Sequence, residues 1–388
     1  MWAAEKGVVD IPMNMYFSYA LTTLWYERQR YLPGVLAVAL SALLIALQCG
    51  LLLGMFKFAS ITVDRAQADI WVGGPSVRSA DLGRPISELY LGRLASQPEV
   101  DYAEVYLQER THWIRPDGGM ELCMIIGSRL EKGALGAVPE LTPTLRTRLA
   151  ERGAVVVDES DLDHLGVQGV GDVAEIHGHR VKVVGLIRGF RGAAGAHIFC
   201  AIDTARTLLR FGPDEVSYLL ARCRDPGSAP FVVQRFRDSY PELSAFTARE
   251  LSLRSRLYWL TKTRGGMALG YAAIVGLVVG AIVTSQTLYA ATAARLREYA
   301  VLWALGIPVQ RMGGLVLAEA LWVGAIGIVL SLPLAFLLKY GATLLNISVL
   351  LPAWLLTTTV SVTLAMALAS GLSALRLLRR IEPAVLLR

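Results

Sequence analysis

Four long apolar runs interrupt an otherwise mixed sequence. They cover residues 33–56, 267–289, 315–338 and 350–375. Each has about 20 residues or more and almost no charge, which is enough to cross a hydrocarbon core of roughly 30 Å. Buried helices of soluble proteins rarely run so far without a charged side chain. The pattern therefore predicts four transmembrane helices, the first of them far along the chain from the other three.

The first apolar run has some features of a secretory signal. Arg28 and Arg30 precede it, and Ala-Gln-Ala follows at residues 66–68. However, the run is longer than the usual apolar region of about 7–15 residues, and about thirty residues come before it. We therefore expect an uncleaved anchor. Apolar positions at helical spacing within residues 14–31 predict an amphipathic lead-in helix along the inner membrane surface.

Basic residues predict the orientation, because the cytoplasmic flanks of membrane helices are rich in Lys and Arg. The loop between the third and fourth spans has only Lys339, whereas the other flanks carry Arg28, Arg30, Arg295, Arg297, Arg311, Arg376, Arg379, Arg380 and Arg388. All of these arginines fall on one side if both termini are cytoplasmic, which leaves residues 59–266 outside. The net charge of +6 then marks cytoplasmic membrane edges, and no nucleic acid partner is needed to explain it.

The expected fold is an α-helical membrane protein with four transmembrane helices (1+3) and a large mixed α+β extracytoplasmic domain between the first and the second. The predicted segments are a lead-in helix 1–32, a first span 33–58, an external domain 59–266, a second span 267–292, a cytoplasmic segment 293–312, a third span 313–338, an external loop 339–349, a fourth span 350–375 and a cytoplasmic tail 376–388.

The composition agrees with a membrane protein. Hydrophobic residues make up 54% of the chain and charged residues 18%, whereas average soluble domains carry about 25% charge. Cys49 lies in the first span, and Cys123, Cys200 and Cys223 lie in the external domain. An odd number excludes a complete disulfide framework there. One bridge among the three stays open.

The external domain mixes strands and helices. Strand-like stretches occupy residues 68–74, 103–113 and 120–127, with a Pro-Asp-Gly-Gly hairpin turn before the last. Residues 128–196 form an inserted strand-rich unit, in which residues 173–187 alternate around a His-Gly-His turn. We expect the first and last portions of the domain to pack together. Helical patterns cover about 86–96, 144–151, 203–211, 230–240 and 251–263.

No catalytic or metal-binding motif emerges from the sequence. It lacks the phosphate-binding loop, the G-x-S-x-G elbow, H-E-x-x-H and the dinucleotide fingerprint. His177 and His179 have no third ligand at a motif spacing, so a polar hairpin tip is the favoured interpretation. The acidic stretch 158–164 lacks the regular spacing of a calcium loop. It is read as a strand end followed by a capped helical turn.

Glu319 is the exception in spans that are otherwise nearly free of ionisable groups. Proton-driven transporters place acids within the membrane, but one Glu near the cytoplasmic edge supports proton coupling only weakly. We favour a hydrogen bond to the neighbouring cytoplasmic loop.

Glycine pairs four residues apart predict close helix packing in the first two spans. The pairs are Gly50 with Gly54, Gly266 with Gly270, and Gly276 with Gly280. This spacing stacks the glycines on one helix face and lets another backbone approach. The contact can form within one chain or between two chains.

Residues 293–312 place charge and a short apolar helix between two spans. Arg295, Arg297 and Glu298 leave the membrane, and Gly306 with Pro308 just beyond ends the helix. Its apolar side chains, Val301, Leu302, Trp303 and Leu305, can be buried against lipid head groups or against a partner. We expect a cytoplasmic partner to grip this segment.

The chain resembles the MacB/FtsX-like permease superfamily of ABC transporters. "RLREYAVLWALGIP" resembles the family's coupling segment between the second and third spans, and "LAEAL" at 317–321 resembles the motif that follows. "RRIEPAVLLR" at 379–388 resembles the family's terminal motif, with Leu in place of its Ala. The external domain is most similar to DevC-type exporter permeases, through "ADIWV", "VVVDES", "RVKVVGLIRGF" and "HIFCAIDTARTLL".

This resemblance implies a mechanotransmission permease of the bacterial inner membrane that works as a dimer, most simply a homodimer. Two copies of a separate ABC ATPase would carry the ATP and Mg²⁺, so this chain binds no cofactor and is not itself an enzyme. A periplasmic adaptor and an outer-membrane channel are expected partners. The ATPase-coupling residues would be Arg295, Arg297, Glu298, Tyr299, Leu302, Trp303 and Gly306.

Three functions fit the same topology. The first is export of a lipid-like or other hydrophobic or amphipathic substrate. The second is an FtsX-like subunit that actuates an extracytoplasmic enzyme without transporting anything, and the third is lipoprotein release. The likeness to DevC-type permeases favours export.

Overall fold

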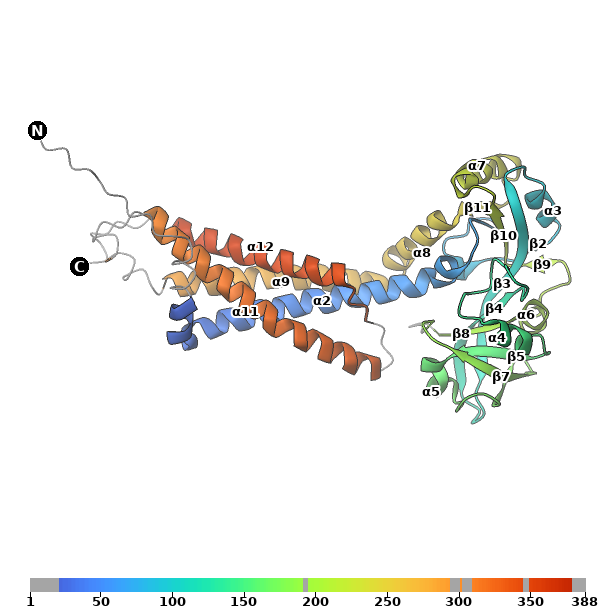
Figure 1. The fold of residues 1–388 in the computed structure, drawn as a ribbon, viewed down its shortest axis with the longest axis horizontal. Coiled ribbons are helices and arrows are strands. Elements are labelled where there is room, and N and C mark those ends of the chain that lie inside the picture. Colours follow the sequence, from blue (N-terminus) through green and yellow to red (C-terminus); the bar gives the residue numbers. More distant parts are fainter. Residues whose placement is uncertain (1–20, 191–194, 294–300, 302–308, 345–348, 379–388) are drawn as a thin grey trace, which may run out of the picture. The chain divides into compact units, whose positions relative to one another are not determined.

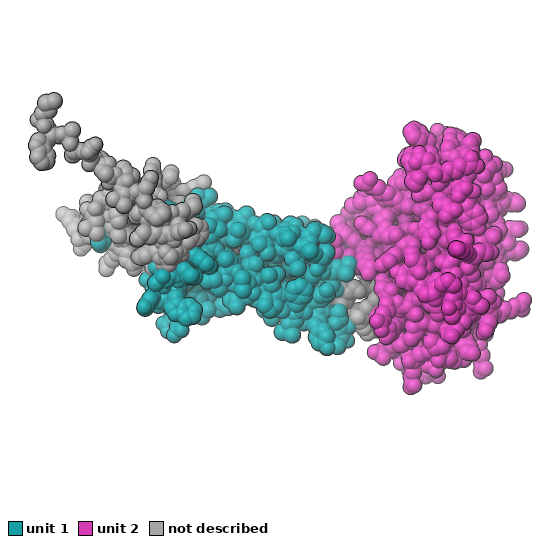
Figure 2. Space-filling model, viewed as in Figure 1, with its two compact units in different colours: residues 1–52, 269–345, 349–388 teal, residues 53–268, 346–348 magenta. Residues whose placement is uncertain are grey.

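The computed structural model describes residues 21–190, 195–293, 301, 309–344 and 349–378. The chain divides into two compact units, drawn in two colours in Figure 2. The membrane unit comprises residues 1–52, 269–345 and 349–388, and the extramembrane unit comprises residues 53–268 and 346–348.

Four helices are long and apolar enough to cross a membrane, which confirms the predicted spans. They are α2 (Arg28–Arg65), α9 (Arg264–Ala293), α11 (Val309–Leu344) and α12 (Ala353–Leu378). In Figure 1 they are the long blue, tan, orange and red helices. Of the predicted lead-in, residues 21–26 and 28–32 are helical, and residues 1–20 lie outside the described part. α11 runs on to Leu344, into the predicted external loop.

Small residues hold the membrane helices together. A buried cluster joins α2, α11 and α12 through Val38, Ala320, Val323 and Ala367. A Cβ added at Gly324 would lie 3.2 Å from Ala367 Cβ. The close approach of these backbones is the packing mode that membrane helices use when lipid supplies no hydrophobic driving force.

A nine-stranded mixed sheet forms the core of the extramembrane unit, in the order β11-β1-β10-β3-β4-β8-β5-β7-β6. The strands are β1 (Ile70–Gly73), β3 (Val100–Ile114), β4 (Met120–Ser128), β5 (Ala154–Asp158), β6 (Val173–Ile176), β7 (His179–Ile187), β8 (Ala196–Ala201), β10 (Tyr218–Cys223) and β11 (Ser244–Thr247). β1 pairs with both β10 and β11. The predicted packing of the first and last portions of the domain is therefore confirmed.

The long strand β3 connects the two halves of this sheet. Its residues 100–106 pair with β10, and its residues 107–114 pair with β4. β4 then pairs in parallel with β8, which is followed by β5 and the β6–β7 hairpin. The strands within residues 128–196 thus belong to the same sheet as β4 and β8. One continuous strand ladder therefore runs through the whole unit.

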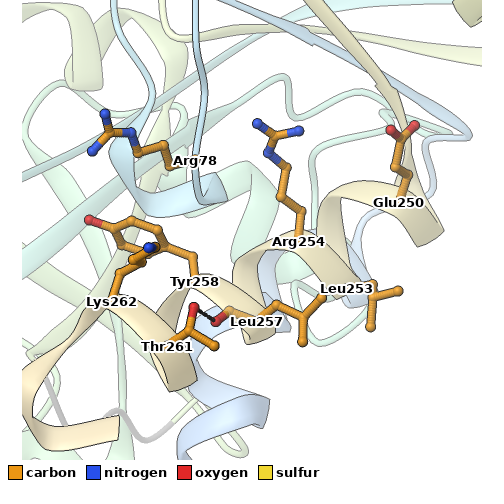
Figure 3. Close-up of a pocket in the computed structure, with 8 residues that line it drawn as sticks. All are labelled: Arg78, Glu250, Leu253, Arg254, Leu257, Tyr258, Thr261 and Lys262. Atoms are coloured by element: carbon orange, nitrogen blue, oxygen red, sulfur yellow. Dashed lines mark hydrogen bonds between the residues drawn. The ribbon is translucent and has the colours of Figure 1, made fainter. Parts of the chain in front are cut away.

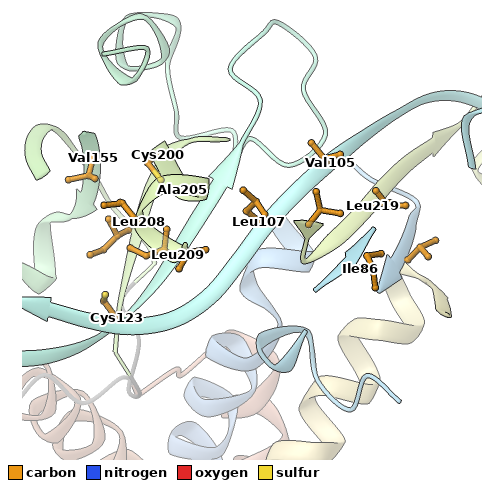
Figure 4. Packing of buried hydrophobic residues seen from close by; sticks show 14 of the residues in the cluster. Ile86, Val105, Leu107, Cys123, Val155, Cys200, Ala205, Leu208, Leu209 and Leu219 are labelled. Atoms are coloured by element: carbon orange, nitrogen blue, oxygen red, sulfur yellow. The ribbon is translucent and has the colours of Figure 1, made fainter. Parts of the chain in front are cut away.

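Side chains alternate between the two faces of the sheet and build two cores. Val105 and Leu107 belong to one cluster, and Tyr106 between them belongs to the other, as the two-residue period of a strand requires. The first core, part of which is drawn in Figure 4, is covered by α3 (Tyr90–Ala95), α6 (Ile202–Leu209) and α7 (Ala229–Ser239). The second is covered by the end of α2, by α4 (Pro143–Leu149) and by α8 (Ala248–Lys262).

One expectation about this unit is wrong, and one question that the sequence left open is settled. Residues 86–87 are not helical, because they form strand β2 (Ile86–Ser87) against β9 (Glu215–Val216), and the helix begins at Tyr90. All four cysteines are free thiols, so the bridge left open does not form in this structure. Burial raises the pKa of the Cys123 thiol to about 12, which keeps it protonated.

Candidate functional site

The predicted ATPase-coupling residues lie outside the described part of the chain. They are Arg295, Arg297, Glu298, Tyr299, Leu302, Trp303 and Gly306. In the sequence they lie between α9 and α11.

Glu319 forms a hydrogen bond with the first span. Tyr31 donates its hydroxyl to Glu319 Oε2 at 2.9 Å, and the two side chains are 3% and 5% exposed. Tyr31 lies one turn inside α2 and Glu319 lies in α11. The carboxylate therefore joins two helices, and sequence reasoning did not identify this partner.

The predicted packing glycines of α9 lie against α2. A Cβ at Gly280 would come within 2.9 Å of Ser41, and one at Gly276 would lie 3.8 Å from Leu44 Cβ. Ser41 also donates to the Gly280 carbonyl at 3.3 Å. These two glycines thus serve a contact within one chain.

The other predicted glycines have different surroundings. Gly50 faces the segment before α12, because its added Cβ would lie 2.9 Å from Val349 and its carbonyl accepts from Leu350 N at 3.0 Å. Gly54 is buried in α2, and Gly270 is half-buried in α9. Of the two α2 glycines, Gly50 therefore packs against the segment before α12.

A cluster of polar and aromatic side chains ties α2 to α8 in the extramembrane unit, and we call it the junction cluster. Its first part is centred on Asp64, at the end of α2. Asp64 accepts from Arg256 Nη2 at 2.7 Å and from the Ser252 hydroxyl at 2.6 Å. Arg256 Nε also donates to Ser60 Oγ at 2.9 Å. Both sides of this contact are helical, so it fixes the helices in register with each other.

The second part of the junction cluster is centred on Asp81, in the turn η1 (Ala80–Leu82). Its carboxylate accepts from Arg110 of β3 and from Trp259 Nε1 of α8, the latter at 3.2 Å. The Arg110 guanidinium also lies over the Trp259 ring, 5.3 Å from its centroid, an arrangement that attracts a cation. Ser255 of α8 accepts from Ala80 N at 2.9 Å. The helix is thus bonded to the strand that spans the sheet.

Aromatic rings complete the junction cluster. Phe58 of α2 contacts Trp259 edge-on, with 5.5 Å between centroids, and contacts His197 of β8 at 5.4 Å. His197 Nδ1 bonds to the Phe190 carbonyl at 2.8 Å. Burial lowers the pKa of His197 to about 4, although the Phe190 carbonyl opposes this shift. A neutral ring therefore packs here at physiological pH.

The junction cluster is suited to transmit displacement. It bonds the continuation of the first span and the helix that precedes the second span to β3 and β8. Packed interiors pass strain on because they have few voids. Sequence reasoning predicted the helix over about 251–263 but missed Asp64, Asp81, Arg110 and His197, whose partners are distant in sequence.

The stretches considered for metal chemistry have structural roles. Asp158 ends β5 and accepts from Ser160 N at 2.9 Å and from Phe190 N at 2.7 Å, so it caps the turn that follows. This confirms the capped turn. The His177 ring contacts the Leu208 carbonyl at 2.8 Å and the Thr111 hydroxyl at 3.1 Å. Both of its nitrogens are thus used at the hairpin tip.

One comparison with known protein families matches the part of the chain that contains the last three membrane helices. A model of the FtsX-like permease C-terminal family matches residues 270–383. This range includes most of α9, the whole of α11 and α12, and the predicted coupling segment. No curated protein matches the chain.

Two solved structures are similar to part of the chain. The periplasmic region of MacB from Actinobacillus actinomycetemcomitans is 10% identical and covers 49% of this chain and 94% of its own, with a TM-score of 0.34. The extracellular domain of the noncanonic ABC-type transporter YknZ from Gram-positive bacteria is 11% identical and covers 46% of this chain and 99% of its own, with a TM-score of 0.32.

The match over residues 270–383 agrees with the resemblance found in the sequence, and the mixed α/β domain lies in the chain between the first candidate span and the other three, as that resemblance requires. The chain is therefore a membrane protein that carries an FtsX-like permease domain.

Proposed function

We propose that this chain is the permease subunit of an ATP-driven ABC exporter of the mechanotransmission type, most similar to DevC-type permeases. A separate ATPase, present in two copies, binds ATP and Mg²⁺ and docks on residues 293–312. The chain has no phosphate-binding loop of its own. Its role is to convert the closure of the ATPase subunits into movement of the extramembrane domain.

Two observations together carry this proposal. The FtsX-like range contains the predicted coupling segment, and the junction cluster bonds two helices to the sheet: α2, which contains the first span, and α8, which precedes the second span in the chain. A force applied at the coupling segment therefore has a path of helices and hydrogen bonds to the external strands. Rigid helices transmit such a force without chemistry of their own.

The exposed face of α9 supports a dimer. Only 17% of the most apolar stretch of α9 is buried, whereas 56% of the corresponding stretch of α2 is buried. Large apolar side chains on α9 are exposed, including Tyr271, Ile274 and Val275. In a membrane such a face meets lipid or another helix. We assign it to a second copy of the permease.

The remaining partners follow from the export model. The basic flanks of the spans support a cytoplasmic position for both termini, and we assign the chain to the bacterial inner membrane. The extramembrane domain then lies in the periplasm, where it meets an adaptor and an outer-membrane channel. The substrate is a lipid-like or other amphipathic molecule.

Reconstitution with the ATPase subunit tests this function. Glu298→Lys and Trp303→Asp are expected to abolish permease-stimulated ATP hydrolysis, while the protein still inserts in the membrane and purifies as a dimer. Glu151→Lys, a change of the same charge at an exposed residue of the extramembrane unit, should leave stimulation intact. Wild-type stimulation in both coupling variants, or transport by the chain alone on an ion gradient, would overturn the proposal.

Co-purification separates export from actuation. An adaptor and an outer-membrane channel bound to the complex support export. A hydrolase bound to the extramembrane domain, with no adaptor, contradicts it.

A further inference from the structure

A groove runs along one face of α8. Its volume is about 750 Å³. Figure 3 shows its lining, in which Arg78 stands opposite the helix and the other side chains come from α8. The lining residues that the argument uses are Arg78, Leu253, Arg254, Leu257, Tyr258 and Lys262.

Two parallel stripes of different chemistry line this groove. Arg254, Tyr258 and Lys262 follow one another at four-residue spacing, so they share one line along the helix. Leu253 and Leu257 form the neighbouring line, and they are 56% and 49% exposed. The groove thus offers two cations and a phenol beside an open apolar strip.

The groove has an excess of positive charge. Its carboxylate, Glu250, accepts two hydrogen bonds from Arg237, both at 2.7 Å. Arg78, Arg254 and Lys262 form no ion pair with any residue that the structure describes. Arg256, on another face of the same helix, is bound to Asp64. Arg254 lies over the Phe246 ring, 5.1 Å from its centroid, so none of the three groove cations has its charge neutralised by a carboxylate of the described residues.

We propose that this groove binds an anionic amphiphile, with a phosphate or carboxylate head group on the cations and a hydrocarbon chain along the leucines. Lys262 is followed within two residues by Arg264, where the candidate span begins. Basic residues next to a membrane span attract anionic lipids, and their long stems cover apolar surface. This proposal does not depend on whether the bound molecule is also the transported substrate.

The charges argue against a second copy of the chain in this groove. A two-fold dimer brings equivalent surfaces together, so the cationic line would face its own copy. A small free anion would use the cations but would leave the exposed leucines unexplained. An amphiphile uses both stripes.

Native mass spectrometry of the full-length chain in a neutral detergent tests the proposal. The probes are phosphatidylglycerol, phosphatidylcholine with the same acyl chains, and glycerol phosphate. Phosphatidylglycerol should bind at least about tenfold more tightly than either other probe, because only it offers both an anion and chains. The triple variant R78Q/R254Q/K262Q should lose affinity on the order of 100-fold.

Two further variants make the result specific. Arg249→Gln removes a cation from α8 outside the groove and should leave binding unchanged. L253S/L257S should weaken phosphatidylglycerol but not glycerol phosphate. Equal loss in R249Q, unchanged binding in the triple variant, or glycerol phosphate as tight as phosphatidylglycerol would each overturn the proposal.

A photoreactive phosphatidylglycerol, used on the unmodified protein, gives an answer that does not depend on any variant. Cross-links on residues 253–262 support the groove. Cross-links confined to the membrane-spanning helices contradict it.

Discussion

The hydroxyl of Tyr31 donates a 2.9 Å hydrogen bond to the carboxylate of Glu319, although 288 positions separate the two residues. Both side chains are buried beside the cluster that joins α2, α11 and α12. A carboxylate in such surroundings is costly without polar partners. This bond therefore fixes the first span against the third near the predicted cytoplasmic edge.

Replacing Tyr31 by Phe should destabilise the membrane unit. The change removes the hydroxyl and leaves the buried Glu319 with one partner fewer, at a cost of about 1–3 kcal/mol. Thermal unfolding in detergent should show a lower Tm. Tyr271→Phe, at a tyrosine that is 72% exposed, is the matched control and should leave the Tm unchanged. Equal Tm values for wild type and Tyr31→Phe would contradict this role.

Acid should weaken the extramembrane unit through His197. Its pKa in the folded chain is about 4 because of burial, below its ordinary value of 6.5. Between these values the unfolded chain binds a proton that the folded chain does not, so stability is full above pH 6.5 and falls as the pH drops towards 4. The loss reaches about 3 kcal/mol at most.

The variant His197→Gln isolates this effect. It removes the titrating ring, so the free energy of unfolding should change less between pH 7 and pH 4.5 than in the wild type, whatever its value at pH 7. Urea unfolding monitored by tryptophan fluorescence at a series of pH values gives the two slopes. Identical slopes would show that His197 takes up no proton on unfolding.

The spans and most strands could be predicted because their signals are local. An apolar run of about 20 residues identifies a membrane helix by itself, and strand β3 was placed within a few residues from its alternation. Residues 86–87 were misassigned because their strand exists only through pairing with Glu215 and Val216. No local pattern reveals a partner so far along the chain.

The junction cluster was missed for the same physical reason. Arg256 lies in the predicted helix over about 251–263, but its partner Asp64 lies 192 positions away. Asp81 and Arg110 are ordinary charged residues until the fold brings them to Trp259. The sequence supplies the charges, and only tertiary packing decides which of them meet.

Glu104 should make the wild-type chain less stable as the pH rises. Burial raises the pKa of this carboxyl, although the hydrogen bond from Gly136 N, at 2.6 Å, opposes the shift. Above pH 4.5 the unfolded chain loses this proton before the folded chain does, so stability falls until the folded group also ionises. Glu104→Gln keeps an acceptor for Gly136 and should raise the Tm at pH 7.5 more than at pH 4.5. A lower Tm at both values would mean that the charge itself is needed.

The contact between Asp64 and Arg256 should matter more for coupling than for stability. The two side chains are 36% and 39% exposed, and ion pairs so accessible to water contribute about 1 kcal/mol or less. Asp64→Asn should therefore change the Tm only slightly. Under the proposed function it should still reduce substrate export per ATP hydrolysed, because the bond links α2 to α8.

The ion pair between Asp101 and Arg222 is the matched control. Its side chains are 49% and 39% exposed, but it joins two strands within the sheet and has no part in the junction cluster. Asp101→Asn should lower the Tm as little as Asp64→Asn while leaving export per ATP unchanged. If both variants reduced coupling equally, the loss would reflect a general softening of the domain, and α2 and α8 would have no special part in transmission.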